Sequence, residues 1–412
     1  MSVQGRVALV GPVPPELGGS TSGGVATHQA HLAAGLVAQG VEAFLLATNA
    51  TRPRPTTVPT MPMRGLRLAD PRYLRAVGLG VLTRYGFHLG RARQESRREL
   101  LGRLVWYRRF ICAVRPRLIH VQHPLERCSA VRAVLDRERL RLPIVVTAHS
   151  LFGEHPEPLI RQVMAPNLRA ADRVIAVSPH VAEQAVSLGV DTERVRVIRS
   201  GVDAERFHPG DRRQARSRLG IEAYTPLVVF VGNLEPRKQL DVLLHAMVQV
   251  RRAVPDARLA IVGSGAAAGA DDQTRRLQHL ACKVDLQEAV RFTGAVDADT
   301  LLGWYTAADV FALPSSSEAQ GIAALEAMGC GVPVVASAVG GLLSTIDDGH
   351  DGYLVPPGDA NALADRLVAV LTNRPAQLTL GRAARRKVEQ EFSWSSRVAA
   401  TIEVYREVLG CA

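Results

Sequence analysis

Two glutamates eight positions apart, Glu318 and Glu326, lie in a segment that could bind an anion and a diol. The segment follows the apolar run Val310–Leu313, and a helix is expected to open near Gly321. Free backbone N–H groups and the partial positive charge of a helix start attract anions. Glu326 lies about 7 Å further along the helix axis, where its carboxylate can accept two hydrogen bonds from a vicinal diol such as that of ribose. The simpler alternative is a helix with a solvated glutamate at each end.

Two adjacent cations, Arg237 and Lys238, follow the apolar run Leu227–Gly232 and are expected to open a helix over Gln239–Val250. Cations at the carboxyl end of a strand can neutralise an anionic ligand such as a diphosphate. The alternative is an exposed basic pair on a solvated helix face. The chain has only three lysines, which favours a specific role for Lys238.

Two features of the amino-terminal half could also contact a ligand. The glycine-rich stretch Gly19–Val25 follows the first apolar run, and bare backbone there can approach a phosphate, although a flexible turn is the alternative. His149 follows the run Ile144–Ala148, at the carboxyl end of an expected strand. A lone histidine is more often structural than functional. His120 and His123 are interpreted as structural residues or as part of the wall of a ligand site, on the acceptor side if the chain is a transferase.

Short apolar runs alternate with helical stretches along the whole chain and predict the strands of two α/β units. Because the runs are continuously apolar, they indicate parallel strands covered on both faces. Two doubly wound units place the ligand in a cleft between their strand carboxyl ends, and the Pro-, Thr- and Arg-rich stretch Thr48–Asp70 predicts a long loop. The expected strands are Arg6–Val10, Val41–Ala47, Leu118–Gln122, Ile144–Ala148, Arg173–Val177 and Val195–Ile198, then, after a linker near Gly201–Asp211, Leu227–Gly232, Arg258–Gly263, Val290–Thr293, Val310–Leu313, Val332–Ala336 and Tyr353–Val355.

The segment Ser317–Ser337 resembles the signature of retaining glycosyltransferases of family 4, which contains a Glu-x7-Glu motif. The resemblance spans nearly all of residues 173–409, and it continues through Val231–Lys238, Phe292–Gly294, Ala307–Phe311, Val339–Gly341, Gly352–Pro357 and Phe392–Trp394. It implies a GT-B fold, in which two Rossmann-like domains with doubly wound parallel sheets face each other across a cleft. Residues 1–203 would form the acceptor-side domain and residues 204–392 the donor domain. A last helix, expected over Phe392–Leu409, would pack back on the first domain with residues from about 393 to 412.

The resemblance also implies a role for each candidate residue. Glu326 would hold the donor ribose, Glu318 would lie beside the transferred sugar, and Lys238 stands where the family keeps a diphosphate-binding lysine. His149 stands where a family histidine contacts the transferred sugar. The expected catalytic residues are Lys238, Arg237, Glu318 and His149, and the expected donor-binding residues are Gly23, Gly24, Gly321, Ile322, Glu326 and Val296.

Three positions bear on how the family pattern is applied to this chain. Asn233 stands where many members carry a phosphate-contacting arginine, so Arg237 is the candidate for that role. Arg199–Asp203 replaces the family's Pro-Asn-Gly-Val-Asp, which concerns the hinge rather than the chemistry. Asp297–Asp299 matches the DxD of metal-dependent transferases, but it lies at an expected helix start, where capping is favoured. Transferases of this fold generally need no metal, and neither a metal nor another cofactor is expected.

Length and composition fit two or three globular domains with anionic partners. The chain has 412 residues, a net charge of +11 and a pI near 10, although the preponderance of arginine and alanine is partly compositional bias. The five scattered cysteines contain no CxxC, which favours a reduced, cytoplasmic setting without zinc or disulfides. No run of eighteen apolar residues occurs, so no transmembrane helix is expected.

The segment Arg84–Arg117 contains ten arginines interleaved with apolar and aromatic residues. Its helical spacing predicts a basic amphipathic helix that could lie peripherally on an anionic membrane, at its cytoplasmic face. The alternative is a core-packed helix with an arginine-rich solvated face.

The sequence therefore predicts transfer of a hexose-type sugar from a UDP- or GDP-sugar to an acceptor hydroxyl, with retention of configuration, in glycan, glycolipid or natural-product biosynthesis. The leaving diphosphate would accept the proton of the acceptor hydroxyl on the same face, since no carboxylate is evidently placed as a nucleophile. The alternatives are a noncatalytic sugar-nucleotide-binding protein and, more remotely, an arginine-rich nucleic-acid-binding protein. No nucleic-acid-binding motif is present, so no nucleic-acid partner is expected. The donor base, the sugar and the acceptor stay open.

Overall fold

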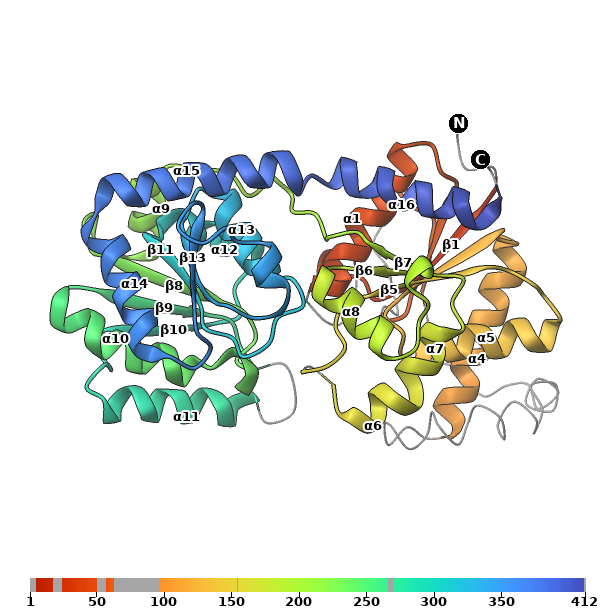
Figure 1. Ribbon diagram of the computed structural model, residues 1–412, viewed down its shortest axis with the longest axis horizontal. Coiled ribbons are helices and arrows are strands. Elements are labelled where there is room, and N and C mark those ends of the chain that lie inside the picture. Colours follow the sequence, from red (N-terminus) through yellow and green to blue (C-terminus); the bar gives the residue numbers. More distant parts are fainter. Residues whose placement is uncertain are drawn as a thin grey trace. The chain divides into compact units, whose positions relative to one another are not determined.

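The computed structural model describes residues 5–17, 24–49, 57–62, 97–153, 155–265 and 270–410. The chain divides into two compact units, which we call unit 1 (residues 1–200 and 394–412) and unit 2 (residues 201–393) (Figure 1). Each unit is built around one parallel sheet covered by helices. Continuous burial along most of these strands explains why the sequence shows them as unbroken apolar runs.

Unit 1 contains a seven-stranded sheet in the order β3-β2-β1-β4-β5-β6-β7. All neighbouring strands pair in parallel, for example Leu9 opposite Leu45 and His120 opposite Val145. The strands are β1 (Val7–Gly11), β2 (Ala43–Ala47), β3 (Thr60–Pro62), β4 (Leu118–Gln122), β5 (Ile144–Ala148), β6 (Arg173–Ala176) and β7 (Val195–Val197).

The helices of unit 1 include the last helix of the chain, which packs against the first. Val398, Ile402 and Tyr405 of this last helix share a buried core with Leu32 and Leu36 of the first. The helical segments are η1 (Pro15–Leu17), α1 (Gly24–Ala38), α4 (Arg97–Val114), α5 (Glu126–Glu138), α6 (Glu157–Leu159), η2 (Ile160–Met164), α7 (Ala165–Arg169), α8 (Pro179–Ser187), η3 (Thr192–Arg194) and α16 (Trp394–Leu409).

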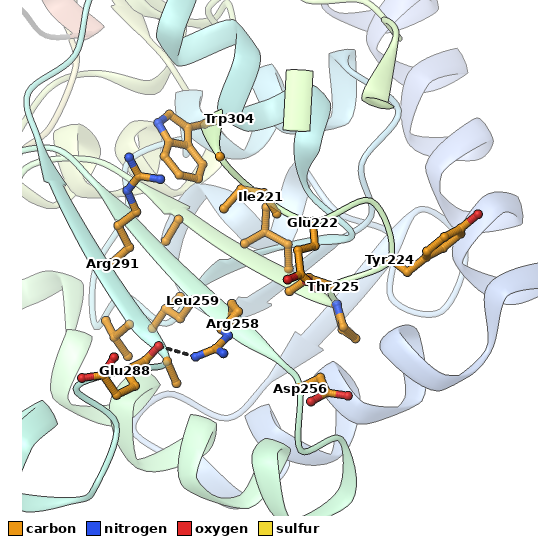
Figure 2. A pocket seen from close by; sticks show the side chains of 16 residues that line it. Ile221, Glu222, Tyr224, Thr225, Asp256, Arg258, Leu259, Glu288, Arg291 and Trp304 are labelled. Carbon is orange, nitrogen blue, oxygen red and sulfur yellow. Dashed lines mark hydrogen bonds between the residues drawn. The ribbon is translucent and has the colours of Figure 1, made fainter. Parts of the chain in front are cut away.

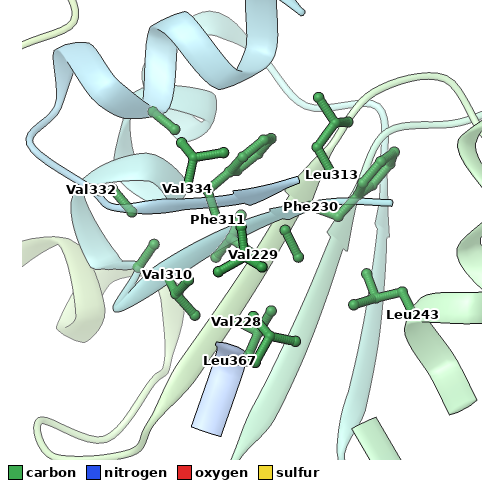
Figure 3. Close-up of a cluster of buried hydrophobic side chains, with 14 of the residues drawn as sticks. Val228, Val229, Phe230, Leu243, Val310, Phe311, Leu313, Val332, Val334 and Leu367 are labelled. Atoms are coloured by element: carbon green, nitrogen blue, oxygen red, sulfur yellow. The ribbon is translucent and has the colours of Figure 1, made fainter. Parts of the chain in front are cut away.

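Unit 2 contains a six-stranded parallel sheet in the order β10-β9-β8-β11-β12-β13. Figure 3 shows its core, in which Phe230, Phe311 and Leu313 pack with the valines of the central strands. The strands are β8 (Leu227–Val231), β9 (Arg258–Val262), β10 (Val290–Gly294), β11 (Val310–Leu313), β12 (Val334–Ser337) and β13 (Gly352–Val355). The helical segments are α9 (Arg212–Leu219), η4 (Pro236–Lys238), α10 (Leu240–Ala253), α11 (Ala270–Lys283), α12 (Ala298–Ala307), α13 (Ile322–Gly329), η5 (Gly340–Ser344), α14 (Ala360–Thr372) and α15 (Arg374–Glu391).

The strand order of each sheet reverses at one point, between β1 and β4 in unit 1 and between β8 and β11 in unit 2. Ligands of doubly wound sheets bind outside the strand carboxyl ends at such a point. The loops that follow β8 and β11 carry Lys238 and Glu318, and the loops that follow β4 and β5 carry His123 and His149. The topology thus brings residues that are distant in sequence to the same edge of each sheet.

All twelve strands expected from the sequence are present, with small shifts of their ends, but three other expectations were wrong in detail. The long loop expected over Thr48–Asp70 contains β3, a short edge strand that pairs with β2 and lacks an apolar run; residues 50–56 and 63–70 lie outside the described part of the chain. The last helix begins at Trp394 rather than Phe392, whose side chain is buried in the core of unit 2. Lys238 lies in a separate turn before α10 rather than at the helix start.

The arginine-rich segment lies partly outside the described residues, which resume at Arg97. Helix α4 buries Leu104, Tyr107, Phe110 and Ile111, so these apolar side chains belong to the core of unit 1. In the described part of the chain, no helix is both long and apolar enough to cross a membrane.

Candidate functional site

The centre of the candidate site in unit 2 is a buried ion pair between Lys238 and Glu318. The Lys238 ammonium donates a hydrogen bond to Oε1 of Glu318, and the Ser315 hydroxyl donates to the same oxygen at 2.8 Å. Lys238 is 9% exposed and Glu318 is 6% exposed. The structure therefore joins two residues that the sequence proposed separately, across the point where the strand order reverses.

Arg237 connects the turn after β8 to the loop after β11 through both its side chain and its backbone. Its guanidinium donates to Glu235 Oε2 at 2.7 Å and to the Ser317 carbonyl oxygen at 3.3 Å, and it lies 3.8 Å from Glu318 Oε2. The Arg237 carbonyl oxygen accepts a hydrogen bond from the Ser316 N–H at 2.8 Å. The turn after β8 and the loop after β11 are thus one connected structure.

A third segment, η5, holds the loop after β11 from its other side. The Gly341 N–H donates to the Glu318 carbonyl oxygen at 2.8 Å, and the Thr345 hydroxyl donates to the Gln320 carbonyl oxygen at 3.1 Å. A Cβ atom at Gly341 would lie 1.9 Å from the Ala319 carbonyl oxygen, so only glycine permits this approach. The loop ends at Gly321, whose φ of 84° precedes the start of α13.

Gln239 follows Lys238 directly and adopts a left-handed backbone conformation with φ 46° and ψ 47°. Side chains other than glycine are disfavoured there by about 1–2 kcal/mol. This conformation turns the chain from η4 into α10, which explains why the expected continuous helix start was wrong. Local strain of this kind is often found beside functional groups.

Glu326 lies on α13, half-buried, and its Oε2 accepts a hydrogen bond from the Tyr305 hydroxyl at 2.7 Å. Burial raises the pKa of Glu326 to about 7, although the Tyr305 hydrogen bond and the charge of Arg206 act in the opposite direction. The expected donor-binding residues Ile322 and Val296 are half-buried and pack against the core of unit 2. Tyr305, which the sequence did not single out, is fully buried on α12.

In unit 1, His149 is buried at the end of β5, and its Nε2 lies 2.7 Å from Gln122 Oε1. The His28 ring meets it edge-on, with ring centroids 4.7 Å apart. Burial, followed by the neighbouring histidines, holds the pKa of His149 well below its usual value. Gly24 is the first residue of α1, whereas Gly23 and the preceding glycine-rich stretch from Gly19 lie outside the described residues.

His120 and His123, the two other histidines that the sequence analysis considered, have different surroundings. His120 is fully buried, with Nδ1 2.7 Å from the Tyr405 hydroxyl and Nε2 2.7 Å from the Thr147 hydroxyl. His123 has a positive φ of 76° and places Nε2 3.2 Å from Nε2 of His155. His120 is therefore an internal residue, whereas His123 belongs to a cluster around the end of β4.

Asp297 is the N-cap of α12, as the sequence analysis expected. Its Oδ1 accepts hydrogen bonds from the N–H groups of Asp299 and Thr300 at 3.0 and 2.9 Å. Asn233, the departure from the family pattern, is exposed, and its amide lies 3.4 Å from Glu235 Oε1. Arg237 and Asn233 thus share the carboxylate of Glu235.

A separate cavity of about 550 Å³ lies at the opposite end of the unit 2 sheet, among the residues that begin β8, β9 and β10. Figure 2 shows Arg258, Glu288, Arg291 and Trp304 around it, with the Arg291 guanidinium 5.3 Å from the Trp304 ring centre. Because Lys238 and Glu318 follow the carboxyl ends of the strands, this cavity is not part of the candidate site.

Comparison with known proteins decides the family. Residues 22–206 match the family Glycosyltransferase Family 4, and residues 211–387 match the family Glycosyl transferases group 1. A D-inositol 3-phosphate glycosyltransferase of Saccharomonospora viridis is 37% identical over 289 residues, which are 67% of each chain. One of Kribbella flavida is 33% identical over 330 residues, covering 76% of this chain and 77% of the relative. This chain belongs to glycosyltransferase family 4.

Solved structures agree with this family 4 assignment. The sucrose-phosphate synthase of Thermosynechococcus elongatus is 26% identical, with a TM-score of 0.78 over 99% of this chain and 100% of its own. HepE of Anabaena, in complex with UDP and glucose, has the same TM-score at 20% identity over 97% and 99% of the two chains, which supports the fold alone. The chain is therefore a hexosyltransferase with the α/β GT-B fold, as the sequence predicted.

The contact between Gly341 and the Glu318 loop yields a stability prediction. Gly341→Ala is expected to lower the free energy of unfolding by about 1–3 kcal/mol, because its methyl group would overlap the Ala319 carbonyl. Gly303→Ala in α12 is the matched control, since its Cβ would lie 3.9 Å from the nearest atom and alanine favours a helix. Urea unfolding compares the two variants; equal stabilities would contradict the role given to Gly341.

Proposed function

We propose that this enzyme transfers a hexose-type sugar from a UDP- or GDP-sugar to an acceptor hydroxyl with retention of the anomeric configuration. The observation that carries the proposal is the buried Lys238–Glu318 pair beside the start of α13. Such a site offers a cation, a carboxylate and free helix N–H groups to one ligand, which suits a sugar diphosphate. The UDP and glucose bound to the related HepE fold also favour a nucleotide-sugar donor.

In this proposal the donor diphosphate binds Lys238, with Arg237 and the N–H groups near Gly321 and Ile322. A lysine ammonium has three N–H donors, and Glu318 receives one of them. The remaining donors are available to a diphosphate oxygen. Charge builds up on that oxygen as the glycosidic bond breaks, so the cation stabilises the transition state more than the bound donor. Val296 and Glu326 complete the nucleotide side, with Glu326 accepting the ribose hydroxyls.

Retention is proposed to proceed without a covalent intermediate on Glu318. Oε1 of Glu318 already accepts hydrogen bonds from Lys238 and Ser315, which lowers its nucleophilicity. The carboxylate is better suited to orient sugar hydroxyls. The leaving diphosphate oxygen then accepts the proton of the acceptor hydroxyl on the face where the new bond forms.

The two halves are proposed to divide the substrates, with residues 204–392 binding the donor and residues 1–203 binding the acceptor. The helix of residues 393–412 belongs with the acceptor half. His149 would contact the transferred sugar, and the glycines Gly23 and Gly24 would adjoin the diphosphate. A cyclitol phosphate is the first acceptor to test, because relatives are named D-inositol 3-phosphate glycosyltransferases.

Nucleotide release tests the function directly. The wild-type enzyme is incubated with a panel of UDP- and GDP-hexoses, with and without D-inositol 3-phosphate, and thermal shift measures binding of each nucleotide. Acceptor-dependent release of UDP or GDP, with a product of unchanged anomeric configuration by NMR, supports the proposal. Absence of release and of thermal stabilisation across the panel would reject the nucleotide-sugar donor.

Lys238→Ala is expected to lower turnover by about 10²–10³-fold while donor affinity falls less, because the ammonium acts mainly on the leaving charge. Lys238→Arg should restore only part of the rate, since a planar guanidinium does not reproduce a compact ammonium. Steady-state kinetics with the best donor measure both variants. Lys283→Ala, which removes an exposed lysine of unit 2, is the control. If folded Lys238→Ala kept more than about a third of its turnover, the diphosphate would not bind there.

Glu326 gives the donor Michaelis constant a pH dependence. The ionised carboxylate is a stronger acceptor for both ribose hydroxyls than the protonated carboxyl group, so the donor Michaelis constant should rise as the pH falls below about 7. Tyr305→Phe removes a hydrogen bond that lowers the Glu326 pKa, and the midpoint should move to higher pH. Glu326→Gln should raise the constant and remove the dependence. A wild-type constant independent of pH on both sides of 7 would contradict the ribose assignment.

We further propose that the enzyme binds anionic membranes peripherally at their cytoplasmic face, by charge rather than by insertion. The apolar residues Leu104, Tyr107 and Phe110 of α4 are buried, whereas Arg109, Arg115 and Arg117 are exposed. Sedimentation with vesicles should therefore require anionic lipid and weaken at raised salt. Arg109→Glu combined with Arg117→Glu should weaken it further. Binding that is negligible with every lipid would reject this proposal.

A further inference from the structure

A chain of buried hydrogen-bonding groups connects His149 with the last helix of the chain. His149 Nε2 lies 2.7 Å from Gln122 Oε1, and the other end of this amide, Gln122 Nε2, lies 3.5 Å from His120 Nε2. His120 in turn contacts the hydroxyl groups of Thr147 and Tyr405, both at 2.7 Å. Gln122, His120, Thr147 and Tyr405 are fully buried, so water does not compete for these contacts.

The amide of Gln122 gives the chain of contacts a direction. An amide nitrogen can only donate, so His120 Nε2 accepts, and the Thr147 hydroxyl donates to the same nitrogen. His120 then carries its proton on Nδ1 and donates it to the oxygen of Tyr405. At the other end the amide oxygen can only accept, so His149 Nε2 is the donor to Gln122.

This direction determines what His149 offers to a ligand. Burial, followed by the neighbouring histidines, holds the pKa of His149 well below its usual value, so the ring is neutral at physiological pH. A neutral imidazole with its proton on Nε2 has a free lone pair on Nδ1. Within the described part of the chain, the only hydrogen-bond partner of the His149 ring is Gln122.

We propose that Gln122 is a positioning residue that fixes His149 in the Nε2–H tautomer, so that Nδ1 accepts a hydrogen bond from a ligand hydroxyl. This inference rests on the proposed function, in which that ligand is the transferred sugar. The inference adds a requirement that the presence of a histidine at position 149 does not give by itself. The ligand group that faces His149 must be a hydrogen-bond donor. A sugar that lacks a hydroxyl at this place, or carries an ether there, would leave Nδ1 without a partner.

The tautomer is measured directly by long-range ¹H–¹⁵N NMR of donor-free protein labelled at histidine, with His149→Gln used to assign the signal. The wild type should show His149 protonated on Nε2. Gln122→Met, which removes the acceptor oxygen that faces His149 Nε2, should lose the preference. A wild-type ring protonated on Nδ1 would overturn the proposal, and that measurement does not require any Gln122 variant to fold.

Steady-state kinetics distinguish a positioning role of Gln122 from a purely structural one. Gln122→Met should lower kcat by about 5–10-fold with a smaller change in the donor KM. Gln184→Met, which removes a glutamine–histidine contact at the surface of α8, is the control. A Gln122→Met variant with unchanged tautomer and unchanged kcat would also overturn the proposal. Failure of the proposed transfer would instead appear as absent nucleotide release from wild type.

Discussion

The buried ion pair of Lys238 and Glu318 is the interaction on which the site of unit 2 depends. Removing two charges from water is unfavourable unless the partners are held at hydrogen-bond distance and their remaining groups are satisfied. The pair therefore requires the loops after β8 and β11 to keep a fixed spacing. The contacts of Ser315, Ser316 and Arg237 all serve that spacing, because each links the two loops or binds the Glu318 carboxylate.

Glycines let the backbone come close enough to maintain this arrangement. Gly341 rests against the Ala319 backbone, and a Cβ at Gly263 would lie 2.0 Å from the Gly232 carbonyl oxygen at the ends of β8 and β9. Gly321 takes a positive φ as the chain turns into α13. At Gly341 and Gly263, neighbouring main chain occupies the space that a side chain would fill. Polar backbone groups and the buried Lys238–Glu318 pair therefore lie together at the carboxyl edge of the unit 2 sheet.

The sequence predicted those features that depend on residues close together in the chain. Continuous apolar runs identified the buried strands, and the segment that follows the run Val310–Leu313 identified the start of α13 near Gly321. Edge strand β3 was missed because its three residues have no apolar run. Gln239 broke the expected helix because its left-handed conformation has no signature in a glutamine. Partners such as Tyr305 and Gln122 could not be foreseen, because their contacts join residues 21 and 27 positions apart through the packing of different elements.

The two units solve the problem of burying polar groups in different ways. Unit 2 keeps a cation and an anion together, which suits a ligand that is itself charged. Unit 1 instead keeps four buried histidines neutral: burial is the largest cause that lowers the pKa of His28, His120, His123 and His149. A neutral imidazole presents a directional lone pair without attracting phosphate. In the proposed function, this separation leaves the charged groups to the diphosphate and the neutral groups to a sugar hydroxyl, so the two kinds of group do not compete for the same part of the donor.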